Sequence, residues 1–311
     1  MSSRLLNPFH AQINGHETFP LRQLWIPKLT RYLRDMKRKQ QSPALNGEDA
    51  IVKLGVGKNM VNSMRFWANA SGMVDYRSCQ LTELGELIFG SVDGAIDGLD
   101  ESASSMTTQW LIHWRLASNP SSFTPIWFLF NKVNLPFLDR ACFLDTFTEF
   151  CKTMEVKTTQ ASMKRGVDVT LRSYLPRLSG KGYAEDFIEP LLAELDLLEP
   201  RSRDVFAFKR GAHPTLRDEL FVFALLEYWE NLEFSTSTLE FTRITHDIGS
   251  PGKVFKLDQD SVSKRLFKLA ELTEDNLVWT EQAGLRQVIK RGEALTNSNK
   301  FKLKLLRKAY N

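Results

Sequence analysis

The chain has 311 residues, of which 42% are hydrophobic and 25% are charged, and its formal net charge is +4. This composition is typical of a soluble globular protein, and the length allows two or three compact domains. No run approaches the roughly 18 apolar residues of a membrane span, and the N-terminal segment lacks the apolar run of a secretory signal. Three cysteines without CxxC spacing suit a reducing environment. We therefore expect a cytoplasmic protein that has no membrane partner.

Positive charge gathers at both ends of the chain. Residues 1–70 carry eleven Lys and Arg against four Asp and Glu, and residues 281–311 carry eight against two. Residues 71–150 carry four against ten. Basic ends favour contact with a polyanion such as DNA, and a pair of solvated basic termini is the alternative.

The segment 48–90 has the pattern of a DNA-binding winged helix-turn-helix. A short apolar helix over 49–54 and a glycine-rich turn precede a predicted helix over 58–70, and residues 72–90 would supply the wing. Four side chains share the polar face of the second helix: Lys58, Asn62, Arg65 and Asn69. Such side chains suit base edges and phosphates in a major groove, although a merely solvated helix face is the alternative.

A histidine, a carboxylate and an arginine lie close together near the N-terminus. We expect His16 to serve as a general base or a metal ligand, Glu17 as a ligand of a divalent metal, and Arg22 as a phosphate clamp. The same residues also fit a helix cap, in which Thr18 caps a short helix that starts near Pro20, Glu17 complements its dipole and His16 bonds the backbone. A longer helix that starts near Pro27 carries further candidates for contact with DNA: Arg31, Arg34 and Lys37.

Composition divides the rest of the chain. The acidic stretch 91–103 and Pro200 indicate two boundaries, so the predicted domains are 1–97 (winged helix), 98–200 (helical) and 201–311 (helical or winged-helix-like). Apolar spacing in the middle domain predicts five helices, and its many aromatic residues are expected to form the core. These helices span residues 109–118, 125–132, 138–154, 160–175 and 185–198. The predicted fold class is mainly α with small β wings.

The C-terminal third suggests a second winged helix. A helix over 216–230, a Gly-Ser-Pro-Gly turn, a helix over 259–272 and a strand over 277–279 follow one another. Its second helix carries cations that we expect to contact DNA: Lys264, Arg265 and Lys268. In the tail, five cations alternate with apolar residues over 300–308, which indicates a basic segment for phosphate or for a partner.

Several short motifs resemble those of one bacterial family, and they occur in the same order along the chain. They are Gly15-His-Glu-Thr-Phe19, Gly55-Val-Gly-Lys-Asn59, Met64-Arg-Phe-Trp67, Leu81-Thr-Glu-Leu-Gly85, Lys164-Arg-Gly-Val-Asp168, Ser250-Pro-Gly-Lys-Val-Phe-Lys-Leu257 and Ala283-Gly284. The chain resembles the SspB-type proteins of uncharacterised domain that are encoded beside DNA phosphorothioation genes. This resemblance implies a component of an anti-phage system that places sulfur in the DNA backbone and is associated with nicking of one strand. It implies a cysteine desulfurase, an ATPase and a sulfurylating enzyme as partners, and transfers no catalytic residue.

These patterns together predict a component that binds duplex DNA and either nicks one strand or positions it for sulfur insertion. For a metal-dependent nicking endonuclease, the catalytic candidates are His16, Glu17 and Arg22, with Mg²⁺ or Mn²⁺ held by Glu17. A non-catalytic DNA-binding adaptor or transcription-type regulator that recruits other proteins is the main alternative, and a pure interaction scaffold is another. The sequence is also compatible with a homo-oligomer.

Overall fold

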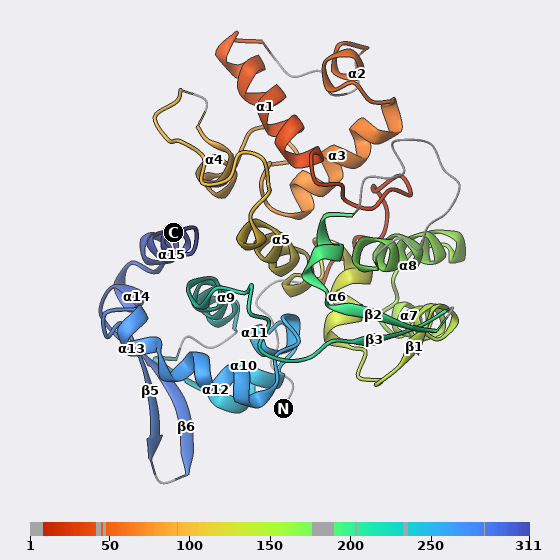
Figure 1. Ribbon diagram of the computed structural model, residues 1–311. Coiled ribbons are helices and arrows are strands. Elements are labelled where there is room, and N and C mark those ends of the chain that lie inside the picture. The colour runs from red at the N-terminus through yellow and green to blue at the C-terminus, as the bar shows by residue number, and fades with distance from the viewer. Residues whose placement is uncertain are drawn as a thin grey trace. The chain divides into compact units, whose positions relative to one another are not determined.

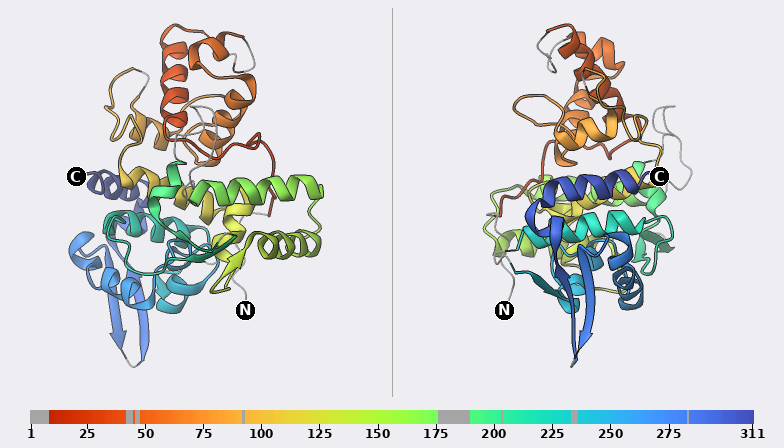
Figure 2. Two further views of the ribbon diagram at one scale, coloured as in Figure 1. Left: turned by 45° about the vertical axis from the view of Figure 1, so that its right-hand side comes forward. Right: turned by 90° about the vertical axis from the view of Figure 1, so that its left-hand side faces the viewer.

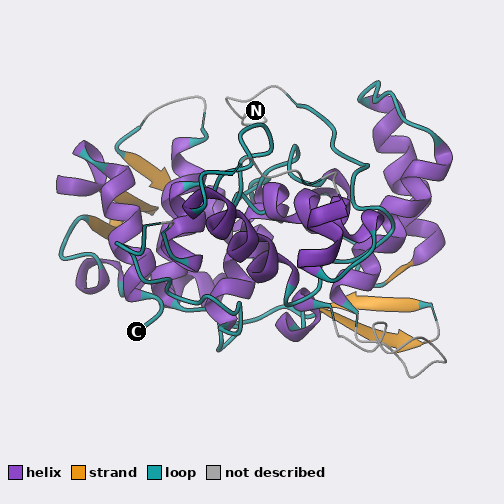
Figure 3. Ribbon diagram, turned by 90° about the horizontal axis from the view of Figure 1, so that it is seen from above, coloured by secondary structure: helices purple, strands orange, loops and turns teal. Residues whose placement is uncertain are grey.

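The computed structural model describes residues 9–41, 45, 48–91, 93–175, 190–202, 204–232, 236–282 and 284–311. Helices dominate these residues, beside two small three-stranded antiparallel sheets (Figure 3). The mainly helical fold class is therefore confirmed. The described residues divide into a larger unit, within residues 11–129 and 135–208, and a smaller unit, within residues 9–10, 130–134 and 209–311.

The N-terminal part of the larger unit is a set of four helices (Figure 1, red to orange). They are α1 (Trp25–Arg38), α2 (Glu48–Leu54), α3 (Lys58–Ala70) and α4 (Glu83–Phe89). The apolar sides of α1 and α3 pack on each other, and both Leu29 and Trp67 are fully buried. Between α3 and α4 the described chain forms an isolated antiparallel bridge between Val74 and Leu81. The helices predicted over 49–54 and 58–70 are confirmed, and the segment where a wing was expected contains this single bridge.

Four further α-helices belong to the larger unit: α5 (Met106–Ser118), α6 (Thr124–Asn131, as far as residue 129), α7 (Arg140–Thr153) and α8 (Gln160–Tyr174). Ser105, Asp139 and Thr159 cap three of them by accepting a hydrogen bond from a backbone N–H in the first turn. Their aromatic side chains form a buried core that includes Trp110 and Phe147. The predicted aromatic core is confirmed for these helices, whereas Phe137, in the loop before α7, is 58% exposed.

A small sheet in the larger unit was not predicted. Strands β1 (Leu138–Asp139), β3 (Val205–Phe208) and β2 (Leu198–Ser202) pair antiparallel in that order. The helix predicted over 185–198 is wrong for residues 190–198, because these form a short 3-10 helix, Leu191–Leu195, that leads into β2. Asp196 ends this turn in the left-handed region, with φ +53°. Residues 185–189 of the predicted helix lie outside the described residues.

The smaller unit alternates helices with a second sheet. Its elements are α9 (Asp218–Glu230), β4 (Thr238–Glu240), α10 (Phe241–His246), α11 (Pro251–Val254), α12 (Gln259–Phe267), α13 (Leu269–Leu272), β5 (Leu277–Gln282), β6 (Leu285–Lys290), α14 (Gly292–Thr296) and α15 (Ser298–Lys308). Helix α9 is buried on nearly all sides, and α15 packs along it. The sheet order is β4-β6-β5, and the β5–β6 hairpin extends away from the helices of its unit (Figure 2).

The two expected domain boundaries lie at different distances from the division between the units. The boundary near residue 200 lies close to the division after Phe208, whereas that near residue 97 falls inside the larger unit. Among the described residues, no helix combines the length and the apolar character that crossing a membrane requires.

A candidate nucleic-acid interface beside helix α3

The loop Gly15–Thr18 has a backbone that few side chains tolerate. Gly15 has φ +108°, and Glu17 and Thr18 have φ +48° and +68°. A Cβ on Gly15 would lie 2.7 Å from Cδ2 of Phe66, so only glycine fits against this ring. Non-glycine residues in sparsely populated regions cost of the order of 1–3 kcal/mol each and cluster at functional sites. This loop is therefore a candidate for the site.

His16 is the buried centre of this loop, with 3% of its surface exposed. Its Nδ1 accepts a hydrogen bond from the backbone N–H of Thr18 at 3.1 Å. Its ring meets Phe66 and Phe123 edge-on, with centroids 6.0 and 5.3 Å away. Because Nδ1 is an acceptor, the proton of the neutral ring sits on Nε2. Nε2 is buried and no hydrogen bond of normal geometry reaches it from the described residues.

The charge state of His16 follows from this environment. Burial lowers the pKa of His16 from 6.5 to about 4, and the positive charges of Arg165 and Arg172 act in the same direction. The backbone of Ile13 opposes this shift by favouring the protonated ring. His16 is therefore neutral at pH 7, a state that lets it donate a proton in a hydrogen bond without carrying charge.

A polar hollow of about 800 Å³ lies against the exposed face of α3. We call it the α3 hollow. Its walls come from the segment 12–17, from α3, from the loop 75–77 and from Ser121. Its polar side chains include Glu17, Asn62, Arg65, Asn69, Tyr76 and Arg77. The fold thus brings three of the four predicted α3 residues together with Glu17, while Lys58 is exposed and does not line the hollow.

Arg65 and Tyr76 form a rigid pair in the wall of the α3 hollow. The Arg65 guanidinium carbon lies 4.0 Å from the centroid of the Tyr76 ring, and Nη2 of Arg65 donates to the Tyr76 carbonyl at 3.0 Å. Tyr76 is nevertheless 51% exposed. In the same loop Asp75 accepts hydrogen bonds at 2.7 Å from the backbone and hydroxyl of Ser78, which lower the pKa of Asp75. The loop is therefore held in shape without contact from a ligand.

A second hollow, of about 300 Å³, shares the Gly15–Thr18 loop as a wall. We call it the His16 hollow, and it is lined by Asn14, Gly15, His16, Glu17, Thr18, Ser162 and Arg165. Arg165 lies on α8, where its Nη2 donates to Ser162 Oγ at 3.3 Å. Helix α8 can pack closely against Pro125 because Gly166 has no side chain. A Cβ at this position would lie 2.9 Å from Pro125 Cγ. Glu17 lines both hollows, and His16 and Arg165 give the second one a donor character.

Arg22 lies elsewhere. It is 5% exposed, and its guanidinium carbon lies 5.8 and 5.4 Å from the ring centroids of Phe19 and Trp25. It lines neither hollow. The short helix expected near Pro20 does not form, because the first helix in this region is α1, which begins at Trp25 without a side-chain cap. His16 does bond the backbone, as the cap alternative expected.

The cations of α1 lie outside both hollows as well. Arg34 forms an ion pair with Glu101 at 3.2 Å, and Lys37 donates to Gln80 Oε1 at 3.4 Å. Arg31 is exposed. Contact of these three residues with DNA stays a prediction, and it would compete with existing partners at Arg34 and Lys37.

The predicted cations of α12 have different fates in the smaller unit. Arg265 is 7% exposed, pairs with Asp218 and donates to the carbonyl of Ala212 at 2.8 Å. Lys268 pairs with the same carboxylate at 2.8 Å. Of the three, Lys264 is the one that is exposed and also makes no ion pair with a described residue. Arg265 therefore offers little surface to DNA, because it is used to hold α9 against α12.

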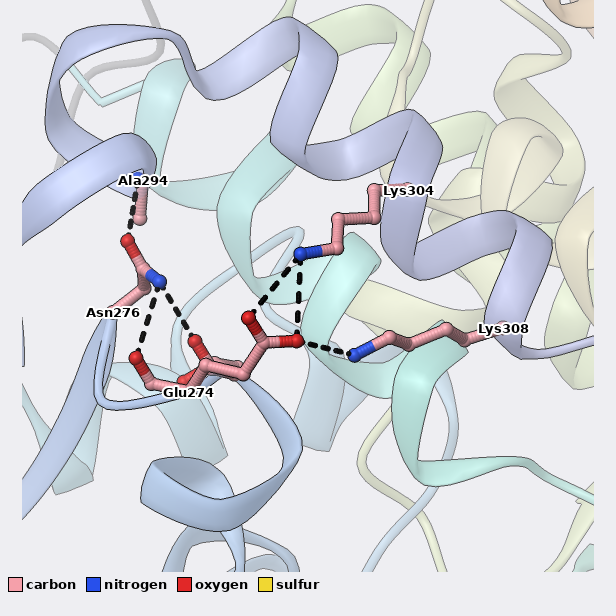
Figure 4. A network of polar contacts seen from close by, with 6 residues as sticks. Glu274, Asn276, Ala294, Lys304 and Lys308 are labelled. Carbon is pink, nitrogen blue, oxygen red and sulfur yellow. Dashed lines mark hydrogen bonds and ion pairs between the residues drawn. The ribbon is translucent and has the colours of Figure 1, made fainter.

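The basic tail is largely neutralised within its own unit. Glu274 accepts hydrogen bonds from Lys304 at 3.3 Å and from Lys308 at 3.0 Å, so one carboxylate contacts two successive turns of α15 (Figure 4). Lys302 pairs with Glu230 on α9. These pairs reduce the charge that the tail can offer to phosphate, and they fasten α15 to its unit instead.

Comparison with known proteins places the chain. A family model described as "Protein of unknown function (DUF4007)" matches residues 13–310. The chain belongs to the DUF4007 family.

Two solved structures share its fold. The "Magnesium ion-bound SspB crystal structure" has a TM-score of 0.81 and 24% identity, covering 97% of this chain and 88% of that one. An "SspB crystal structure" has a TM-score of 0.77 and 22% identity, covering 97% and 93%. No curated protein matches the chain. The resemblance to the SspB type is confirmed at the level of the fold.

The donors of this DUF4007 chain fit a divalent metal only in part. Within the described ranges, no cluster of three or more His, Cys, Asp and Glu side chains could hold a metal ion. Glu17 and Asp75 line one hollow with Asn62 and Asn69, whose amide oxygens are hard donors. Mg²⁺ commonly binds through one or two carboxylates together with waters and substrate phosphates. The donor set therefore fits an ion that shares its coordination with a phosphate, and does not form an all-protein cage.

Sequence reasoning missed several residues of the two hollows. Gln12, Ser121 and Arg165 come from segments distant in sequence, and of these three only Arg165 lies within a motif of the SspB-type resemblance. Tyr76 and Arg77 lie in the expected wing, where a basic-aromatic pair was the available signal.

Proposed function

We propose that this DUF4007 protein is a DNA-binding component of a bacterial DNA phosphorothioation and anti-phage system. The observation that carries the proposal is that Asn62, Arg65 and Asn69 face one polar hollow from a single helix. Amide and guanidinium groups are those with which proteins recognise base edges and phosphates. The fold shared with SspB structures supports the link to phosphorothioation, and the other proteins of such a system are the proposed partners.

Two parts of the chain are proposed to be winged helices. In the smaller unit, helix α9, strand β4, helices α10 to α12 and the β5–β6 hairpin follow one another, with sheet order β4-β6-β5. This order supports a winged helix in which α12 is the recognition helix and the hairpin is the wing. Exposed Lys264 on α12 is its proposed phosphate contact. The order α1–α2–α3 supports the same proposal for the N-terminal part, where the wing is short.

Metal-dependent nicking of one strand is the catalytic form of the proposal. Glu17 lines both hollows and would hold Mg²⁺ or Mn²⁺, which lowers the charge on a bound phosphate and supplies a nucleophilic water. Arg165, which lines the His16 hollow, would pair with the charge of a bound phosphate, and buried His16 would hold the loop that carries Glu17. Buried Arg22 has no part in this site. A non-catalytic adaptor is the second candidate, and it is favoured by the amides and guanidinium groups of the α3 hollow, which need no metal to bind DNA.

DNA binding is tested by gel retardation with the full chain at two salt concentrations. About six phosphate contacts predict a loss of the order of a thousandfold in affinity between about 50 and 200 mM salt. Arg65→Ala and Arg77→Ala should weaken binding, whereas Lys152→Ala, which removes an exposed cation of α7 outside both hollows, should leave it unchanged. Binding without salt dependence, or equal loss in all three variants, would contradict the proposal.

Nicking is tested on supercoiled plasmid with and without Mg²⁺ or Mn²⁺. A nickase should form relaxed circles only with metal, and Glu17→Gln and His16→Asn should each abolish them. The second readout is DNA affinity, which metal should raise for the wild type and leave unchanged for Glu17→Gln. Retarded but intact plasmid, with no effect of metal on affinity, would assign the adaptor function instead.

A further inference from the structure

The α3 hollow is concave where a duplex would require a projecting surface. A recognition helix reads DNA by lying in the major groove, so that its face must stand clear of neighbouring segments. At Asn62, Arg65 and Asn69 the polar face of α3 is bordered by residues 12–17, by the loop 75–77 and by Ser121. A base that has left its stack could enter this hollow and reach the amides of Asn62 and Asn69.

The lining of the α3 hollow suits a nucleobase better than a phosphate. Two cations, Arg65 and Arg77, are balanced by two carboxylates, Glu17 and Asp75. When no metal ion is bound, a phosphate group would bring a negative charge to a site that is neutral in sum. An uncharged, planar and polar group meets no such penalty.

Tyr76 supplies a stacking surface. Its ring is 51% exposed, and Arg65 covers it at 4.0 Å while bonding its carbonyl. The ring is therefore fixed before any ligand arrives, which lowers the entropic cost of stacking a base against it. Single-strand binding proteins use exposed aromatic rings with arginine in this way.

Two amides complete the recognition. The side chains of Asn62 and Asn69 line the same hollow, and neither makes a hydrogen bond to a described residue. An amide presents a donor and an acceptor side by side, which is the pattern that pairs with a base edge. We propose that the α3 hollow receives one unpaired nucleobase of DNA, stacked on Tyr76 and hydrogen-bonded by Asn62 and Asn69.

This inference rests on the proposed DNA-binding function and is tested with the full chain and two duplexes of one sequence. One duplex is fully paired and the other has a single unpaired base. The wild type should bind the second about tenfold more tightly, because the cost of extrusion is already met. Tyr76→Ala should remove this preference, Tyr76→Phe should keep it, and Lys152→Ala serves as the exposed control. Asn69→Ala changes an exposed position, so that folding is preserved, and it should reduce the preference independently.

The outcomes separate the two proposals. Equal, salt-sensitive affinity for both duplexes overturns the base-binding inference and leaves DNA binding standing. A preference that survives in Tyr76→Ala also overturns it. Failure to bind either duplex in a salt-sensitive manner overturns the proposed function and the inference together.

Discussion

The ring Nδ1 of His16 accepts a hydrogen bond from the backbone N–H of Thr18, two residues further along the chain. This bond and the rings of Phe66 and Phe123 fix the imidazole in its neutral form. The conformation of the strained loop and the protonation state of His16 therefore depend on each other. Protonation of the ring at Nδ1 would break this hydrogen bond with Thr18.

Acid should destabilise the larger unit through His16. Its pKa is about 4 in the folded protein and 6.5 when the side chain is fully solvated, so the unfolded chain binds the proton more tightly. Stability is full above pH 6.5 and falls as the pH drops towards 4, by at most roughly 3 kcal/mol. Arg165 and Arg172 strengthen the effect because they repel the charged ring. His16→Asn keeps an acceptor for Thr18 and cannot titrate, so its urea-unfolding free energy should lack this part of the pH slope. An identical slope would refute the assignment.

Gly15→Ala should destabilise the loop. The new Cβ would lie 2.7 Å from the Phe66 ring, at a φ of +108° that alanine rarely adopts. We expect a loss of about 1–3 kcal/mol in the free energy of unfolding, together with weaker DNA binding, because Phe66 also lines the α3 hollow. Gly57→Ala is the matched control, since no atom lies within 4 Å of its Cβ position. It should cost less than about 1 kcal/mol. Comparable losses in the two variants would contradict the prediction.

Asp218→Asn should unfold the smaller unit more easily. It leaves the buried guanidinium of Arg265 without its carboxylate partner and costs roughly 3 kcal/mol. Glu274→Gln breaks the exposed pairs with Lys304 and Lys308 and should change stability very little. Thermal unfolding at low and high salt measures both. The idea fails if the exposed pair proves the more costly.

Lys264→Ala should weaken DNA binding in a salt-dependent way. This exposed cation is the proposed phosphate contact of α12, and its loss should reduce the slope of log affinity against log salt by about 1. Lys308→Ala removes a charge that is already paired with Glu274 and should leave the slope unchanged. An unchanged slope in Lys264→Ala would remove α12 from the interface.

The local spacing of apolar residues predicted most of the helices. The spacing of apolar residues predicted α3 over its full length, Lys58–Ala70, and the helices α6, α8 and α9 to within two residues at each end. The pattern failed at residues 190–198, because an apolar run of this length fits a 3-10 helix and a strand as well as a helix. The pairing of β1 with β3 joins segments about 70 residues apart, which no local period reports.

The sequence by itself determined which side chains share the polar face of α3, because helical geometry depends only on neighbouring residues. The tertiary structure decided that this face borders the Glu17 loop, through contacts such as the bond from Gln12 N to Thr124 Oγ1 across 112 positions. It also decided that Arg265 is buried against Asp218 while Lys264 stays exposed. Arg and Lys look alike as candidates in a sequence, and only long-range packing determines which of them finds a carboxylate and which remains available to DNA.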